Sequence, residues 1–144
     1  MLGVYRSHKE YYQFVLSELS KLAQTRPDQI REYQNAISKM LLLNLDPLVS
    51  VIEPLYPNIG RPAMMQLEIF RSFVLMKDLK IPLNNWVDKL AFNPVLRIIA
   101  GFNYDYMPKT SSYYDFINRT VPLDEAPVLR GFKPKPKKKL KNTT

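Results

Sequence analysis

Residues 62–80, PAMMQLEIFRSFVLMKDLK, form the longest apolar helix that the sequence predicts. Apolar side chains recur there every three or four residues, as on one face of an α-helix, and others widen that face until little of the helix is polar. The apolar positions are Met64, Met65, Leu67, Ile69, Phe70, Phe73, Val74, Met76 and Leu79. A helix of this kind is central to a core, and Ile81-Pro82 should stop it.

The chain before this helix carries the same helical periodicity. Two helices are predicted, over 8–23 and 28–44, each with one apolar stripe. The stripes are Tyr12, Val15, Leu16, Leu19, Leu22 and Ala23 in the first helix, and Ile30, Tyr33, Ile37, Met40 and Leu41 in the second. Asp46-Pro47 signals a third, short helix in which Asp46 caps and Pro47 takes the first helical position. That helix should end before Pro54, where a loop begins.

Two short helices are predicted directly after the long one. Asn84 or Asn85 should cap the first of them. Asn93-Pro94 is the cap-then-proline signal that begins the second, and Gly101 should end it.

The last predicted helix starts with three small polar residues that can cap it, which are Thr110, Ser111 and Ser112. Its inner face carries Tyr113, Phe116 and Ile117. No stretch of the chain shows the two-residue alternation of a half-buried strand. The sequence therefore predicts an all-α fold, a multi-helix bundle of about seven helices with a helix-turn-helix-like C-terminal part and a disordered basic tail.

The predicted helices divide the chain into three parts. A leader of two helices covers residues 1–45. A helical domain covers 46–121, with its helix-turn-helix-like part at 83–119. A Pro/Lys-rich basic linker or tail covers 122–144, where alternating Lys and Pro cannot build a core.

The positive charge is concentrated in that tail. The chain carries a formal net charge of +8, and seven basic residues with no acidic one lie between Arg130 and Thr144. Subtracting these seven leaves +1 for residues 1–129. Such a tail fits a polyanionic partner, but a solvated linker has the same composition, and composition alone does not separate the two.

Much catalytic chemistry is excluded by composition. The chain has no Cys and one His, His8, so that neither a thiolate nucleophile nor a Cys- or multi-His metal site is expected. Its aspartates are scattered over separate predicted helix ends, and two-metal phosphoryl transfer needs carboxylates that converge. We expect a protein that is not an enzyme, with no metal and no cofactor. The N-terminus lacks the apolar stretch of a signal peptide, and we expect a cytoplasmic protein without a membrane role.

The three short helices within 83–119 have the spacing of a helix-turn-helix, in which one helix enters the major groove of DNA. Spacing alone favours an ordinary three-helix packing unit with a Ser/Thr cap, because many helical domains share it.

A longer resemblance covers about residues 43–141. Its segments are NLDPL with IEPLY, the turn Gly60-Arg61-Pro62, EIFRSFVLM at 68–76, WVDKL at 86–90, PVLRIIAGF at 94–102, YDFINR at 114–119 and the run KPKPKKK. In this order and spacing they resemble the N-terminal domain of bacterial insertion-sequence transposases of the DDE class. In that family the catalytic domain is RNase H-like and follows the basic linker, so that no position of these 144 residues inherits a catalytic role.

The resemblance implies the function of a DNA-binding N-terminal portion of a transposase. Its partner is then double-stranded DNA, the terminal repeats of an insertion element, and the last helix docks on the duplex while the tail contacts phosphates. The residues expected to touch DNA are Arg61, Lys109, Thr110, Ser111, Ser112, Asn118, Arg119, Lys133, Lys135, Lys137, Lys138, Lys139 and Lys141. Arg61 can equally be a helix-entry residue held by the geometry of Pro62.

Two other functions stay open on sequence grounds. The helical body can mediate self-association or contact with a full-length transposase, in which case the apolar helix 62–80 is partly exposed. The basic tail can bind an anionic membrane surface, although it carries no lipidation motif and little apolar side-chain area.

Overall fold

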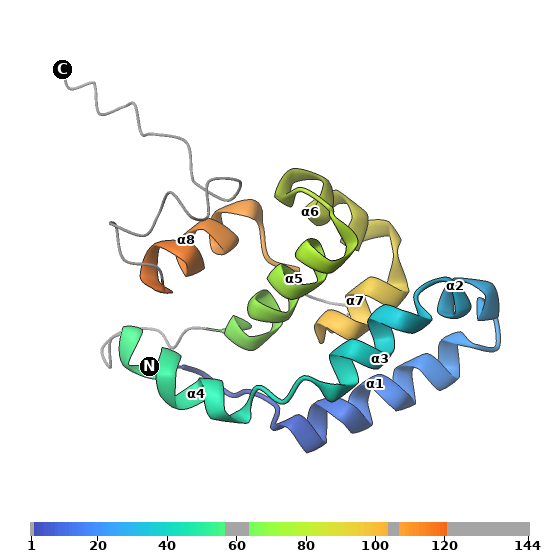
Figure 1. Cartoon of the computed structure of the whole chain (residues 1–144), viewed down its shortest axis with the longest axis horizontal. Coiled ribbons are helices and arrows are strands. Elements are labelled where there is room, and N and C mark those ends of the chain that lie inside the picture. The colour runs from blue at the N-terminus through green and yellow to red at the C-terminus, as the bar shows by residue number, and fades with distance from the viewer. Residues whose placement is uncertain (1, 57–63, 104–106, 121–144) are drawn as a thin grey trace.

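The computed structural model describes residues 2–56, 64–103 and 107–120 of the chain. These residues form eight α-helices and one short 3-10 helix, and no strand, so that the predicted all-α fold is confirmed (Figure 1). The elements are α1 (His8–Leu22), α2 (Pro27–Glu32), α3 (Gln34–Leu42), α4 (Asp46–Ile52), η1 (Glu53–Leu55), α5 (Gln66–Leu79), α6 (Leu83–Phe92), α7 (Pro94–Ala100) and α8 (Thr110–Thr120).

The central helix is α5, as predicted. It packs against α3, α7 and α8, and in Figure 1 it crosses the middle of the molecule with α8 and α3 on opposite sides. Leu67, Ile69, Leu75 and Met76 are each no more than 2% exposed. Burial of large apolar side chains on this scale is the main source of the stability of the fold.

The remaining helices surround this core. α7 packs against α1, α5 and α6 at once, and all its residues except Pro94 and Arg97 are buried. α6 also contacts α8, and thus connects the last helix to the body. Trp86 of α6, the one tryptophan of the chain, is completely buried.

The predicted helix over 28–44 is wrong in one respect, because it is two helices. Tyr33 separates α2 from α3 with φ −104° and ψ 21°. Its N–H is shared between the carbonyls of Gln29 and Ile30, as at a helix end, and its hydroxyl accepts a hydrogen bond from Asn93. The helical period continues on both sides of this bend, so the pattern of apolar residues does not reveal it.

The predicted stripe of the first helix is also partly wrong. Tyr11, Val15 and Leu19 are the buried side chains of α1, whereas Tyr12 and Leu16 are 41% and 46% exposed. Both sets have helical spacing, and only the packing of α1 against α7 selects between them.

The helix starts follow the predicted signals unevenly. Asn93 caps α7 as predicted, since its side chain accepts from the N–H of Leu96, and Gly101 ends that helix with φ 98°. Asp46 is instead the first residue of α4, and its carboxylate accepts from the N–H of His8 at the start of α1. Asp46 therefore pairs with one N–H group that the start of another helix leaves without a helical partner.

Neither Asn84 nor Asn85 caps α6. The helix begins earlier, at Leu83, and the residue before it, Pro82, makes no side-chain cap. The helix α5 begins at Gln66, directly after Met65, which is left-handed with φ 67°. Most of the predicted loop over 54–62 and the basic tail lie outside the described residues, as does the start of the predicted long helix.

The end of α5 yields a stability prediction. Lys80 is left-handed there, with φ 59° and ψ 47°, and its N–H donates to the carbonyl of Met76. Because glycine adopts this conformation without steric cost, Lys80→Gly should raise the free energy of unfolding by about 0.5–1 kcal/mol. Lys77→Gly, on the exposed side of the same helix, should lower it by about 1 kcal/mol. Urea unfolding measures both, and two equal losses would contradict the left-handed turn.

Candidate nucleic-acid interface

The last helix is fastened to the core by one aromatic face. Tyr113, Phe116 and Ile117 are buried, as predicted. The ring of Phe73 on α5 lies 5.7 Å from that of Tyr113 and 6.1 Å from that of Phe116, between ring centres. The Tyr113 hydroxyl lies 3.4 Å from that of Ser72. These contacts leave the opposite face of α8 to solvent.

The predicted contact residues of α8 divide between its two ends. Lys109, just before the helix, and Ser111 are exposed, while Thr110 and Ser112 are half-buried. All four surround the N-terminal turn, where the helix dipole and unpaired N–H groups favour an anion such as phosphate. The N–H of Ser112 is already used, since it donates to the carbonyl of Lys109 at 2.9 Å. Thr110 is the first residue of α8, so the three hydroxyl residues form the first turn of the helix.

The exposed face continues along α8 to its C-terminal turn. Ser111, Asp115 and Asn118 are exposed and spaced four and three residues apart, which places them on one side of the helix. The sequence reasoning missed Asp115, although its spacing from Arg119 was readable as an ion pair. Asp115 puts a negative charge in the middle of the proposed DNA-reading face.

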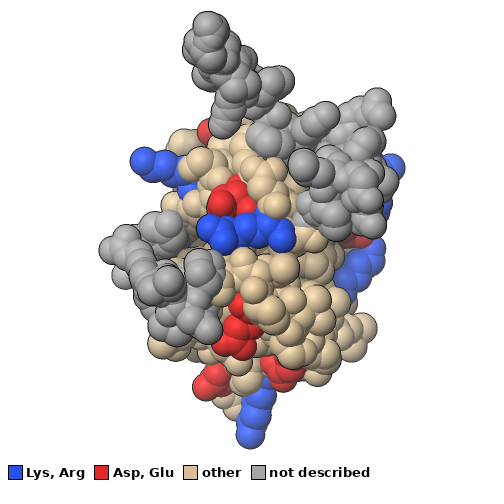
Figure 2. Space-filling model, turned by 90° about the vertical axis from the view of Figure 1, so that its left-hand side faces the viewer, with Lys and Arg blue, Asp and Glu red and all other residues tan. Residues whose placement is uncertain are grey.

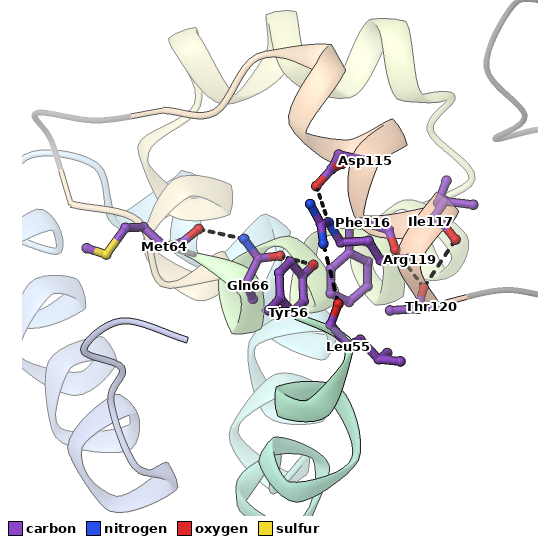
Figure 3. Close-up of polar contacts among 9 residues, drawn as sticks. All are labelled: Leu55, Tyr56, Met64, Gln66, Asp115, Phe116, Ile117, Arg119 and Thr120. Atoms are coloured by element: carbon purple, nitrogen blue, oxygen red, sulfur yellow. Dashed lines mark hydrogen bonds and ion pairs between the residues drawn. The ribbon is translucent and has the colours of Figure 1, made fainter. Parts of the chain in front are cut away.

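Arg119 itself is held by the protein (Figure 3). Its Nε donates to Asp115 at 3.0 Å, and Nη1 donates to the carbonyl of Leu55 at 3.4 Å. Its guanidinium also lies over the ring of Tyr56, 4.8 Å from the ring centre. Arg119 differs in this from Lys109, for which no hydrogen bond or ion pair of the side chain occurs among the described residues.

The described surface is not strongly basic. Residues 2–56, 64–103 and 107–120 hold 13 Lys or Arg and 10 Asp or Glu. Figure 2 shows basic and acidic atoms interspersed over one face of the molecule, without a continuous basic area among the described residues there. Arg61 and the tail residues Lys133, Lys135, Lys137, Lys138, Lys139 and Lys141 lie outside the described residues.

A buried polar cluster, which sequence reasoning also missed, lies where α1, α5 and α7 meet. Arg71 is 1% exposed, its guanidinium stacks on the Tyr11 ring at 3.6 Å, and none of its nitrogens has a hydrogen-bond partner among the described residues. Glu68 is 6% exposed and lies 3.8 Å from Arg6. Both are charged residues within the most apolar stretch of the chain. This interruption was the one feature of the sequence that could have revealed the buried cluster.

Burial controls the ionisation of this cluster. It raises the pKa of Glu68 and lowers the pKa of Arg71, because a low-dielectric interior penalises the charged forms. It also raises the pKa of the Tyr11 phenol to about 12. The Tyr11 hydroxyl donates to the carbonyl of Ile99 at 2.6 Å. The cluster connects α1 to α5 and α7, and it lies on other elements than α8.

A groove of about 580 Å³ runs between α1 and α7. Phe14, Leu22, Ile98 and Phe102 provide its apolar lining. Glu18 and Lys21, on its edge, are paired with each other at 3.1 Å. The groove contains none of the predicted contact residues.

Two further classes of site, a metal centre and a membrane-spanning helix, concern the described part of the chain. No group of three or more His, Asp or Glu side chains there is arranged to hold a metal ion. No single helix there is long and apolar enough to cross a membrane, although the bent pair Gln34–Leu42 and Asp46–Leu55 has the length and composition.

Comparison with known proteins adds no relative. No family model matches the chain, and neither a curated protein nor a solved structure does.

The buried phenols of Tyr11 and Tyr56 predict a loss of stability in alkali. Burial raises both pKa values to about 12, so above pH 10 the unfolded chain releases these protons before the folded chain does. The stability that the two neutral, buried phenols contribute is therefore fully present below pH 10. It is lost as the pH rises from 10 to 12. The slope per group is at most about 1.4 kcal/mol per pH unit.

Urea unfolding from pH 8 to 12 measures this loss. Tyr11→Phe and Tyr56→Phe should each flatten the decline, because each removes one ionisable phenol. Tyr12→Phe, on the exposed side of α1, is the matched control and should follow the wild-type curve. Equal curves for all four proteins would show that neither buried phenol controls the decline.

Proposed function

We propose that this chain is the DNA-binding N-terminal portion of an insertion-sequence transposase, and that it binds the ends of the element without catalysing a reaction itself. The observation that carries the proposal is the division of α8 into a buried aromatic face and an exposed polar face. The N-terminal turn of that helix offers Lys109, Thr110, Ser111 and Ser112 to an anion. The resemblance of residues 43–141 to the transposase domain supplies the choice of DNA.

The proposed division of labour follows from the chemistry of the two regions. Short hydroxyl side chains at a helix start allow the backbone to come close to a phosphate or a base edge. Asn118 extends the same face by two turns, and its amide can donate and accept hydrogen bonds at a base. The tail, with its seven basic residues, adds affinity that does not depend on sequence. A cytoplasmic location is part of this proposal.

Self-association through the apolar helix has less support. Leu67, Ile69, Leu75 and Met76 of α5 are buried among the surrounding helices, the other apolar side chains of α5 are half-buried, and Met64, which precedes the helix, is 52% exposed. Large apolar side chains are exposed elsewhere, for example Leu42 and Phe92 at 84% each. A dimer would have to use such residues. Light scattering over a range of concentrations separates a monomer from this alternative.

The first test concerns the tail. Deleting residues 130–144 should lower affinity for random-sequence duplex DNA and flatten its salt dependence, because each phosphate neutralised contributes about 0.9 to the slope of log affinity against log salt. The helical signal in circular dichroism should not change. A control with all seven basic residues as arginine keeps the charge and should keep the slope. An unchanged slope after deletion would mean that the tail does not contact DNA.

The second test concerns sequence reading by α8. A duplex that binds the full chain well is first selected from a random library, and affinities for it and for a scrambled duplex are compared at one salt concentration. Ser111→Ala with Ser112→Ala should lower the ratio of the two affinities, because base contacts are lost. The matched control, Ser17→Ala with Ser20→Ala on the exposed side of α1, should not.

The free energy of unfolding of the double serine variant, compared with that of a core variant, is the control for this second test. Phe116→Ala should cost about 3–5 kcal/mol of unfolding free energy, because its ring is buried against α5. The double serine variant should cost about 1 kcal/mol or less. If that variant folds and leaves the affinity ratio unchanged, α8 does not read the sequence.

A further inference from the structure

We propose that Arg119 is a positioning residue and not a phosphate contact: it ties the C-terminal turn of α8 to Leu55 and Tyr56, and so sets the angle at which the outer face of α8 meets the duplex. The inference rests on the proposed function and deepens it. It assigns the two ends of α8 different tasks, with anion contact at the N-terminal turn and orientation of the helix at the C-terminal turn.

The contacts of Arg119 use its guanidinium in three directions. Nε donates along the helix to Asp115 at 3.0 Å, and Nη1 donates across the chain to the carbonyl of Leu55 at 3.4 Å. The plane of the group covers the ring of Tyr56 at 4.8 Å. A planar fork with several donors can make these contacts together, whereas the point charge of a lysine cannot.

The residue that the guanidinium of Arg119 covers, Tyr56, is itself buried and hydrogen-bonded. Tyr56 is 5% exposed, and its hydroxyl donates to Oε1 of Gln66 at 2.6 Å. Nε2 of Gln66 in turn donates to the carbonyl of Met64 at 2.8 Å. Figure 3 shows the bonds of Met64, Gln66 and Tyr56 beside those of Asp115, Arg119 and Leu55, between the start of α5 and the end of α8. Arg119 thus joins α8 to the same point at which the chain enters its central helix.

The rest of α8 does not determine its tilt in the same way. The ring contacts to α5 involve Tyr113 and Phe116, in the first two turns, and the hydroxyl of Thr120 bonds back to the carbonyl of Phe116 in its own helix. Arg119 is therefore the polar contact, among the described residues, that joins the last turn to another element.

The experiment compares Arg119→Ala, Arg119→Lys and Lys109→Ala in the full chain, with the selected duplex and its scrambled form as probes. A positioning role predicts that both Arg119 variants lower the affinity ratio several-fold while the slope of log affinity against log salt stays at the wild-type value. Lys109→Ala, as a phosphate contact, should reduce that slope by about 0.9. Tyr56→Phe removes no charge and should lower the ratio in the same direction as the Arg119 variants.

Three results would overturn the proposal. A slope reduced by Arg119→Ala as much as by Lys109→Ala would make Arg119 a phosphate contact. Recovery of the wild-type ratio in Arg119→Lys would show that charge is enough. A wild-type ratio in Arg119→Ala would show that the orientation of α8 does not depend on this residue.

Amide hydrogen exchange keeps this inference separate from the proposed function. Arg119→Ala and Arg119→Lys should speed exchange several-fold in the last turn of α8 and at Tyr56, while Lys109→Ala should not. If the wild-type chain binds no duplex, the proposed function fails. Hydrogen exchange alone then tests whether Arg119 holds the end of α8 against Leu55 and Tyr56. Unchanged exchange in both Arg119 variants would overturn the positioning role whether or not DNA binds.

Discussion

The close approach of α1, α5 and α7 at Gly101 is the constraint on which the rest of the structure depends. A Cβ atom at this position would lie 3.2 Å from Cγ of Glu68 and 3.3 Å from Nη1 of Arg71, and the residue has φ 98°, where side chains are strained. Its carbonyl accepts a hydrogen bond from Arg6 at 2.7 Å. One residue without a side chain therefore lets the N-terminal segment, the central helix and the end of α7 meet.

This junction also holds the residues that follow α7. Arg6 holds Asn103 as well as Gly101, with a hydrogen bond of 2.8 Å to the Asn103 side chain, and it stacks on Phe14 of α1 at 3.8 Å. The segment that leaves α7 therefore starts from a fixed place on α1 and α5. The start of α8 is then packed through Tyr113 and its end through Arg119, so that the orientation of its exposed face results from contacts distributed over the whole chain.

Several polar groups of the body join helices. Asp46 connects α4 to the start of α1, Asn93 connects α7 to Tyr33, and Lys39 pairs with Asp78 at 2.6 Å between α3 and α5. Many charges are thus paired within the body. Other basic side chains of the body are exposed and form no ion pair among the described residues, but they are spread over several elements. The proposed DNA binding relies on the start of α8 and on the basic tail, where seven basic residues occur without an acidic one.

Local signals in the sequence determined the fold class, the central position of residues 66–79, the Asn93 cap, the Gly101 end and the inward face of α8. Each depends on residues a few positions apart, through the helical period, a capping side chain or a conformation that suits glycine. Tertiary packing alone decided that Tyr11 and not Tyr12 is buried, that the chain bends at Tyr33, and that Arg71 and Glu68 lie inside. It likewise decided that Arg119 contacts Leu55, 64 residues away. A periodic pattern shows which side chains share a face, but which face is covered depends on helices that are distant in sequence.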